Sequence, residues 1–420
     1  MTPKIALLFV GLLSFQSLSA QWTLEKCQNM ARANYPLVKQ LDLIEKSTEL
    51  TLSNIDKQYL PQISISAKAT YQSDAIDITL PIPGNPMSLH QSKDQYQAVA
   101  EVNQTLWDGG VTSVRKKIAK SNSEIDQQKI EVELYTLRER VNQLYFGLLL
   151  LQVQSNQLEL LKNELSQNLK KLESAKLNGV VTSSDLDILK VEILTADQKK
   201  QALAASQKIY LTMLSALIGE PLDSESVLEK PSNLVVKPRQ FERPEMHLFN
   251  AQLDALSTQQ KMEQTMLLPK LGLFLQGGYG RPGLNMFSDT FSPFYIGGMR
   301  LSLNLGSLYT RNATQASIEN SKKMVQTSKE TFLFNNNLKC SQYQVEIEKL
   351  KTLIQTDDAI VQLRTNIKNA SSSKLQNGVS TVTDLLRDIN AENTAKLQKS
   401  THELQLLLQI EYLNDQSTSN

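Results

Sequence analysis

Proline is missing from two stretches of this 420-residue chain, each more than 120 residues long. None of the 13 prolines lies between Pro86 and Pro221, and none follows Pro293. Glycine is scarce in the same stretches. Because proline and glycine are the residues that interrupt helices most strongly, both stretches are free to form very long helices.

Cysteine, histidine and excess charge are also scarce, and each scarcity argues against a class of protein. The 2 cysteines are too few for a disulfide framework, and Cys340 lies on an apolar helical stripe that predicts a buried free thiol. The 3 histidines are isolated and lack the spacing of a metal site. Because 44 basic residues face 43 acidic ones, no basic excess indicates a nucleic-acid partner.

Motifs for catalysis and cofactor binding are absent or out of context. The segment GYGRPG, at Gly278–Gly283, formally fits G-x-G-x-x-G, but a proline lies inside it and no helical pattern follows. No G-x-S-x-G nucleophile elbow occurs in the sequence. We therefore expect a protein that is not an enzyme and that holds neither a cofactor nor a metal.

The first 20 residues differ from the rest of the chain. They combine the basic Lys4, the apolar stretch IALLFVGLL and the small residues SLSA, which is typical of a secretory signal peptide. The apolar stretch is too short for a transmembrane anchor. We expect residues 1–20 to be removed, so that the mature chain begins at Gln21 with equal numbers of basic and acidic residues.

Apolar residues recur at every seventh position in both proline-poor stretches. The series are Ile130, Leu137, Leu144, Leu151, Leu158, Leu165 and Leu172, then Leu333, Cys340, Ile347, Ile354 and Val361. Sevenfold spacing is typical of left-handed supercoiled helices. From Thr112 to Leu177 the pattern predicts one helix of about 65 residues, roughly 100 Å long at 1.5 Å per residue.

The other prolines indicate a tandem repeat. Pro36 and Pro61 are 25 residues apart, as are Pro244 and Pro269. Each repeat is expected to hold a helix, a β-hairpin, a very long helix, a tip turn and a helix of about 35 residues. The expected bounds are 21–219 for the first repeat, 220–243 for the connector and 244–420 for the second repeat. The hairpins are expected at about 61–107 and 269–306, and the tip turns at about 178–184 and 377–383.

Each expected hairpin consists of two segments of about ten residues in which apolar and polar side chains alternate. Alternation of period two predicts strands with one apolar and one polar face, and strands of this length cross a bilayer when tilted. Four strands are too few to close a barrel, and open strand edges cannot face lipid. Several copies would therefore have to share one barrel. The alternative for the hairpins is a soluble two-layer sheet, and the alternative for the whole chain is a soluble periplasmic coiled-coil scaffold.

Two nearly identical nonapeptides, NGVVTSSDL at 178–186 and NGVSTVTDL at 377–385, occur in the two halves. Asn-Gly supplies the left-handed conformation that ends a helix. Thr182 or Ser183, and likewise Thr381, can then cap the next helix, with an acidic residue in its first turn. Each nonapeptide therefore predicts the turn of a long helical hairpin.

In their order and spacing these features resemble the TolC family of outer-membrane efflux ducts. The resemblance covers essentially the whole mature chain and rests on the nonapeptides, on NQTLWDGG at 103–110 and on the two Leu-Pro hairpin entries. It implies an α+β membrane protein, a homotrimer with a shared 12-stranded outer-membrane β-barrel of four strands per protomer. A long periplasmic α-helical barrel would continue it. The second counterpart of WDGG departs from the pattern as GSLY, at 306–309.

The resemblance also implies a function. The chain would be the exit duct of a tripartite efflux pump in the outer membrane, passively conducting substrates outward. Its partners would be a periplasmic adaptor protein, an inner-membrane transporter and the outer-membrane lipid, with no nucleic acid. The exit duct of a type I protein secretion system is the alternative within the family.

In the family the helical tips form a periplasmic aperture. The tip residues implied to contact the adaptor are Asn178, Gly179, Thr182, Asn377, Gly378 and Thr381. Asp185 and Asp384 match acidic gate positions, and Arg387 stands where a second aspartate is expected, with Asp388 beside it. Leu375 and Ser380 replace a tyrosine and an arginine that latch the family's gate. The alternative is a plain helix connector with solvated charges.

Overall fold

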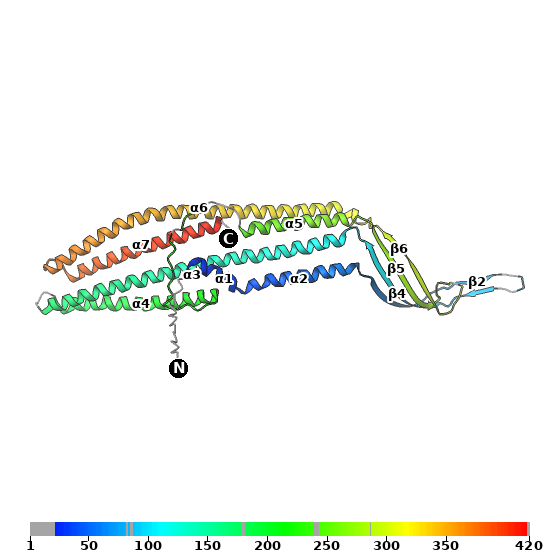
Figure 1. Ribbon diagram of the computed structural model, residues 1–420, viewed down its shortest axis with the longest axis horizontal. Helices are drawn as coiled ribbons and strands as arrows, with labels where there is room; N and C mark the ends of the chain where they lie inside the picture. The colour runs from blue at the N-terminus through cyan, green and yellow to red at the C-terminus, as the bar shows by residue number, and fades with distance from the viewer. Residues whose placement is uncertain are drawn as a thin grey trace, which may run out of the picture. The chain divides into compact units, whose positions relative to one another are not determined.

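The computed structural model describes residues 22–80, 83–84, 87–177, 181–232, 234–237, 243–285 and 287–417 (Figure 1). The chain forms two compact units, and its two longest helices contribute to both. Unit 1 takes in residues up to Val38, Glu131–Pro244 and Leu333 onward. Unit 2 takes in Lys39–Ile130 and Glu245–Phe332.

The two halves of the chain present their helices and main strands in the same order. The first half holds α1 (Leu24–Asn34), α2 (Lys39–Asp56), β1 (Gln62–Tyr71), β4 (Asp94–Trp107), α3 (Val111–Leu177) and α4 (Ser183–Ile218). The second half holds α5 (Pro244–Thr265), β5 (Lys270–Arg281), β6 (Ser292–Ser302), α6 (Ser307–Gln376) and α7 (Val382–Ser417). The long helices α3 and α6 have 67 and 70 residues, and α4 and α7 have 36 each. The helix predicted to begin at Thr112 thus begins one residue earlier.

The first predicted helix is interrupted. Tyr35 has an extended backbone (φ −65°, ψ 126°), and a 3₁₀ turn at Pro36–Val38 separates α1 from α2. Proline disfavours the helical conformation in the residue before it, which explains why α1 stops there. In the second half Pro244 is the first residue of α5, where proline fits well because the first helical N–H has no partner within the helix.

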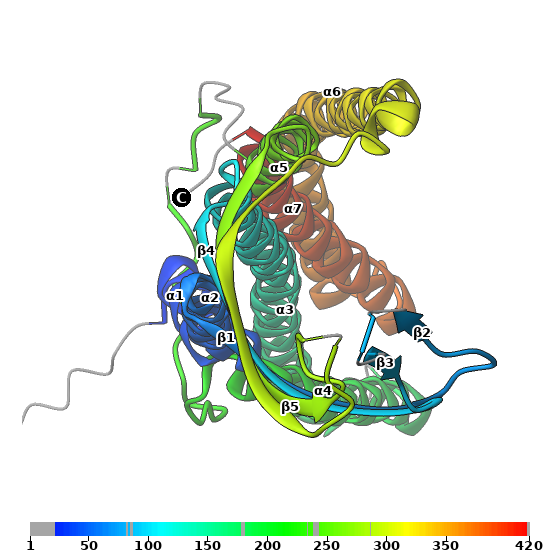
Figure 2. The same cartoon turned by 90° about the vertical axis from the view of Figure 1, so that its right-hand side faces the viewer.

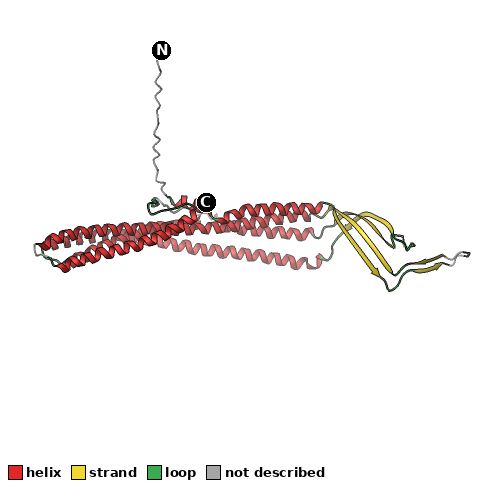
Figure 3. Cartoon of the chain, turned by 90° about the horizontal axis from the view of Figure 1, so that it is seen from below, coloured by secondary structure: helices red, strands yellow, loops and turns green. Residues whose placement is uncertain are grey.

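The main sheet has four antiparallel strands in the order β1-β4-β5-β6, drawn as the yellow arrows of Figure 3. Its register places the alternating apolar residues of all four strands opposite one another on one side, because Ile65 faces Ala100 and Leu273 faces Met299. We call this side the apolar sheet face: Ile63, Ile65, Tyr71, Tyr96, Val102, Leu273, Leu275, Tyr279, Tyr295, Met299 and Leu301. It is solvent-exposed in this protomer, with Ile65 81% and Tyr295 80% accessible.

The edges of the main sheet are open in the described part of the chain. β1 pairs only with β4, and β6 pairs only with β5. Figure 2 shows the sheet bowed along β4 and β5. A second hairpin, β2 (Asp77–Leu80) with β3 (Met87–His90), lies in the segment between β1 and β4.

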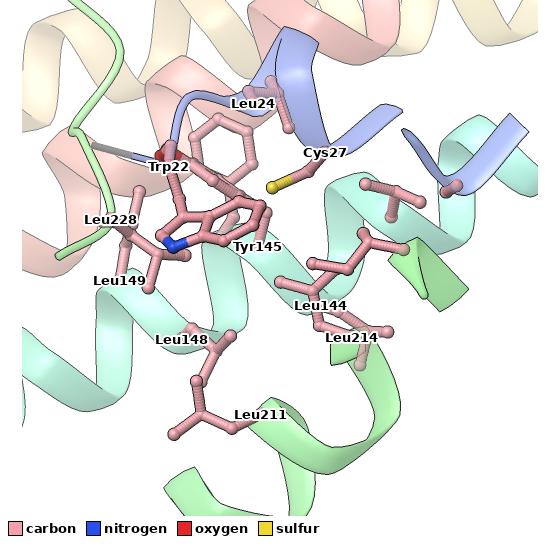
Figure 4. Packing of buried hydrophobic residues seen from close by; sticks show 14 of the residues in the cluster. Trp22, Leu24, Cys27, Leu144, Tyr145, Leu148, Leu149, Leu211, Leu214 and Leu228 are labelled. Atoms are coloured by element: carbon pink, nitrogen blue, oxygen red, sulfur yellow. The ribbon is translucent and has the colours of Figure 1, made fainter. Parts of the chain in front are cut away.

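In the core of unit 1, the residues from Trp22 to Ala31 pack against α3 and α4 (Figure 4). The Tyr145 hydroxyl lies within hydrogen-bond distance of the carbonyls of Trp22 (2.5 Å) and Glu229 (2.6 Å) and shares its one proton between them, which fastens the connector to α3. Cys27 and Cys340 are buried free thiols, as predicted for Cys340, and burial raises the pKa of Cys27 to about 11. Among the residues that the structure describes, none of the helices is both long and apolar enough to span a bilayer.

Candidate gate at the helical tips

One apolar cluster holds the ends of the long helices together. It combines Leu165 and Leu172 of α3 and Leu186 and Leu189 of α4 with Val382, Leu385, Leu386 and Ile389 of α7. Leu375 of α6 packs against it. Leu375 therefore serves packing at the second tip. Figure 1 shows α4 turning back along α3, and α7 along α6.

The first tip is fixed by a capping box at the start of α4. Asn178 and Gly179 lie outside the described residues. The backbone N–H of Asp185 donates to Thr182 Oγ1 (3.2 Å), and the backbone N–H of Thr182 donates to Asp185 Oδ2 (2.9 Å). This reciprocal arrangement satisfies backbone donors that a helix start leaves unpaired. Asp185 thus has a local structural role at the tip.

The second tip ends α6 with a Schellman motif. The N–H of Gly378 donates to the carbonyl of Leu375 (3.0 Å), and the N–H of Val379 donates to that of Lys374 (2.9 Å). Gly378 has φ +71°, in the left-handed region where a side chain is strained, whereas the space around it is open. Asn377 follows Gln376, the last residue of α6, and its N–H donates to the carbonyl of Ser373 (3.2 Å).

The start of α7 repeats the capping box and adds an arginine. The N–H of Asp384 donates to Thr381 Oγ1 (3.1 Å), and the Thr381 N–H and hydroxyl donate back to Asp384 Oδ2. Ser380 Oγ donates to the same oxygen (3.4 Å), and Arg387 Nη1 lies 3.4 Å from Asp384 Oδ1. The hydrogen bonds from Thr381 lower the pKa of Asp384 most, and the charge of Arg387 lowers it further. Asp384 is therefore anionic near neutral pH.

Arg387 and Asp388 differ sharply in exposure. Arg387 is 70% exposed in its side chain and lies 3.4 Å from both Asp384 and Asp388 carboxylate oxygens. Asp388 is buried, and Ser371 Oγ of α6 donates a short hydrogen bond to it. The structure thus brings Ser380, Asp384 and Arg387 together, while Asp388 faces into the α6–α7 seam.

A buried ion cluster lies behind the second tip, and the motif analysis missed it. Glu392 of α7, 2% exposed, accepts from Thr365 Oγ1 (2.7 Å), Lys368 Nζ (2.8 Å) and Lys396 Nζ (2.9 Å). Lys368 also contacts Glu164 of α3 (2.8 Å), so one lysine links three helices. Burial alone would raise the pKa of Glu392, but the hydrogen bonds from Lys368, Lys396 and Thr365 prevail and lower it to about 2.

The sequence did carry a signal for this cluster. The second sevenfold series continues from Val361 to Lys368 and then to Leu375. A lysine at an apolar seam position costs packing and specifies pairing in coiled coils, so it indicates a buried acidic partner.

Comparison with known proteins identifies the relatives of this architecture. A family model described as outer membrane efflux protein matches residues 29–220. No curated protein sequence matches the chain. Among solved structures, VceC of Vibrio cholerae is 15% identical with a TM-score of 0.64, over 93% of this chain and 96% of that chain.

Two other outer-membrane channels are similar in the same way. CmeC of Campylobacter jejuni is 15% identical with a TM-score of 0.62, over 94% of this chain and 87% of that one. MtrE of Neisseria gonorrhoeae, solved in an open state, is 13% identical with a TM-score of 0.64, over 94% and 88%. At these identities the likeness establishes the fold. Together with the matched family model, it confirms the predicted α+β fold of long helices with four strands per protomer and the resemblance to outer-membrane efflux ducts.

Proposed function

We propose that this chain, which carries an outer membrane efflux protein domain and the fold of outer-membrane channels, is the outer-membrane exit duct of a tripartite efflux pump. It would conduct substrates passively outward, with its helical part in the periplasm. An adaptor protein and an inner-membrane transporter would deliver the cargo. The main support is the sheet, whose strands β4 and β6 lead directly into the long helices α3 and α6 and whose apolar face is exposed.

The sheet supports a barrel shared between copies. Its apolar face matches the lipid-facing side of a membrane barrel, and its opposite face is mostly polar. Four strands with open edges at β1 and β6 cannot stand alone in lipid. Pairing the β6 edge of one copy with the β1 edge of the next buries both edges. Three copies would supply twelve strands, the number that the resemblance implies.

The helices of unit 1 support the same head-to-tail arrangement. α6 exposes Phe334, Leu338 and Val345, at spacings of four and seven, and α4 exposes Val191 and Leu194. Apolar residues at these spacings form a stripe on one side of a helix. The exposed apolar stripes lie on two different helices, α6 and α4. If α6 of one copy packs against α4 of the next, the contact is heterologous, and contacts of this kind can close a ring.

The tips are the proposed gate and adaptor contact. Asp185, Asp384 and Arg387 would surround the aperture of the ring, and carboxylates gathered in a narrow pore attract cations. The tip turns at Asn178, Gly179, Thr182, Asn377, Gly378 and Thr381 would meet the adaptor. The capping boxes of Thr182 and Thr381 support this role, because they give the described part of each tip a defined backbone geometry.

Purification and electron microscopy test the proposal. We expect the protein to require detergent and to form a three-fold hollow cylinder that conducts ions in planar bilayers. A chain that extracts into buffer without detergent and conducts nothing would instead be the periplasmic scaffold. A monomer in mild detergent by light scattering would contradict the shared barrel.

A further inference from the structure

A basic cavity lies in unit 2 where the polar side of the main sheet meets the first turns of α3. Its volume is about 340 Å³. Three cationic side chains line it, Arg115 of α3, Lys270 of β5 and Arg300 of β6. The aromatic rings of Tyr59 and Phe274 line it as well. We call it the junction cavity.

Asp108 is the one carboxylate among the described residues that line the junction cavity, and its oxygens already accept hydrogen bonds. Asp108 is buried and accepts from the backbone N–H groups of Gly110 (2.9 Å) and Thr112 (2.6 Å) and from the Tyr59 hydroxyl. The two backbone donors belong to the start of α3, where the helix dipole itself favours a negative charge. Asp108 therefore balances the helix end and does not form an ion pair with any of the three cations.

None of the three cations forms an ion pair with another described residue. Arg115 Nη1 donates to the neutral Gln58 Oε1 (2.7 Å). Arg300 lies over the Phe274 ring, 4.9 Å from its centroid. The nearby carboxylate of Glu101 accepts from the amides of Asn103 (2.8 Å) and Gln276 (3.0 Å), and its charge interacts with Arg300 without a direct ion pair.

Several basic residues lie near the start of α3, where positive charge does not stabilise a helix. Arg115, Lys116, Lys117 and Lys120 follow one another with no acidic residue before Glu124. Cations near a helix N-terminus interact unfavourably with the helix dipole. Lys116 is compensated by an ion pair with Asp56, whereas Arg115 lines the junction cavity. Arg115 donates to the neutral Gln58 and has no carboxylate partner among the described residues.

We propose that the junction cavity binds organic anions that carry an aromatic or other apolar group, and that such anions are a cargo class of the duct. Guanidinium groups match carboxylate and sulfonate oxygens in geometry, and Lys270 adds a point charge. Phe274 and Tyr59 supply an apolar surface for the rest of the molecule. The inference rests on the proposed function, because only a barrel lumen would bring cargo past this polar side of the sheet.

Block of single-channel current by 1-naphthalenesulfonate tests the inference, with neutral 1-naphthalenemethanol as the matched probe. We expect the sulfonate to block wild-type channels and the alcohol to block far less. Lys270→Gln and Arg300→Gln should each weaken the sulfonate block roughly tenfold, because a hydrogen bond to a charged group contributes that much or more. Lys46→Gln removes a 70% exposed lysine of α2 outside the cavity and should leave the block unchanged.

The outcomes separate the two proposals. The channels could conduct but be blocked equally by the sulfonate and the alcohol, or the variants could be blocked as strongly as wild type. Either result would contradict anion binding in the junction cavity while remaining consistent with the proposed duct. A wild-type protein that conducts nothing overturns the duct. In that case equilibrium dialysis of the detergent-solubilised protein against the sulfonate decides the cavity, with Arg115→Gln as a further variant if Arg300→Gln fails to fold. Absence of saturable binding there would overturn the cavity too.

Discussion

The two helical tips share nearly the same nonapeptide, but the helices behind them are joined by different chemistry. Residues of the two tips correspond at an offset of 199 positions. Where α3 and α4 bury Leu172 and Leu189 in the apolar tip cluster, α6 and α7 place Ser371 and Asp388, joined by a hydrogen bond. The turn is therefore conserved between the halves while the seam is not.

The next pair of facing residues, one step further from the tip, is also apolar in the first hairpin and polar in the second. Leu169 and Ile193 pack against the apolar cluster in the first hairpin, whereas the second has Lys368 and Glu392, joined at 2.8 Å. A buried ion pair contributes little net stability compared with apolar residues of similar size, because both charges lose their hydration. The second hairpin thus exchanges packing for specific, directional bonds. This makes α6–α7 the hairpin whose seam is easier to open.

Removing one partner from the buried cluster should have the largest effect. Glu392→Ala leaves Lys368 facing only Glu164 and strips Thr365 and Lys396 of their acceptor. We expect a loss of about 3–5 kcal/mol in the free energy of local opening of α7. Hydrogen exchange of α6 and α7 peptides measures it. The control Lys396→Gln removes a half-exposed partner, can keep a hydrogen bond to Glu392 and should cost less than Glu392→Ala.

Acid should act on the same residue. Folding lowers the pKa of Glu392 from 4.5 to about 2, so the folded protein binds fewer protons than the unfolded chain between these values. The stabilisation by Glu392 is therefore complete above about pH 4.5 and is lost as the pH falls toward about 2. Hydrogen exchange of α7 against pH should show this loss, and Glu392→Gln should remove it. An unchanged pH profile in the variant would contradict the assignment.

Giving the second hairpin the residues of the first sharpens the comparison. The double change Lys368→Leu and Glu392→Ile replaces the ion pair by its apolar counterparts. We expect stability to be unchanged or higher by about 1–4 kcal/mol, the reverse of Glu392→Ala. If the double variant is as unstable as the single one, the cluster is more than a substitute for packing. Thermal unfolding of the detergent-solubilised protein distinguishes these results.

The turn of the second tip should be less sensitive. Gly378→Ala meets no steric obstacle but forces a side chain into φ +71°. We expect a cost of about 1–2 kcal/mol, because the left-handed conformation disfavours residues with a Cβ atom. Gly378→Asn, which tolerates this conformation better, should restore part of the stability. Faster hydrogen exchange at the end of α6 would report the loss.

Sequence reasoning predicted the long helices, the strands and the capping residues of the tips because each depends on a local pattern. Sevenfold spacing specifies a helix, and Thr381 with Asp384 specifies a helix start, whatever surrounds them. The bonds of Glu392 could not be predicted in the same way, because they depend on which faces of α3, α6 and α7 meet. The break at Pro36 was missed because this proline was used only for its 25-residue spacing to Pro61, although proline disfavours the helical conformation in the residue before it.

The charges on the second tip should have the smallest effect on stability and a measurable one on conduction. Arg387 takes the place that Ile188 has in the first hairpin, and it lies 3.4 Å from Asp384. An exposed pair of this kind contributes only about 0.2–0.5 kcal/mol within one helix. Around a shared axis, however, Arg387 would offset the repulsion between three copies of Asp384 and favour the closed state.

Arg387→Ala should therefore raise single-channel conductance in planar bilayers while leaving thermal unfolding almost unchanged. Asp384→Asn should weaken block by divalent cations added from the periplasmic side, because fewer carboxylates would remain at the aperture. The matched control is Lys190→Ala, which removes an exposed i,i+3 partner of Asp187 at the first tip (3.3 Å). If Arg387→Ala and Asp384→Asn conduct and block like this control, the charges of the second tip are ordinary solvated side chains, and the gate depends on the α6–α7 seam alone.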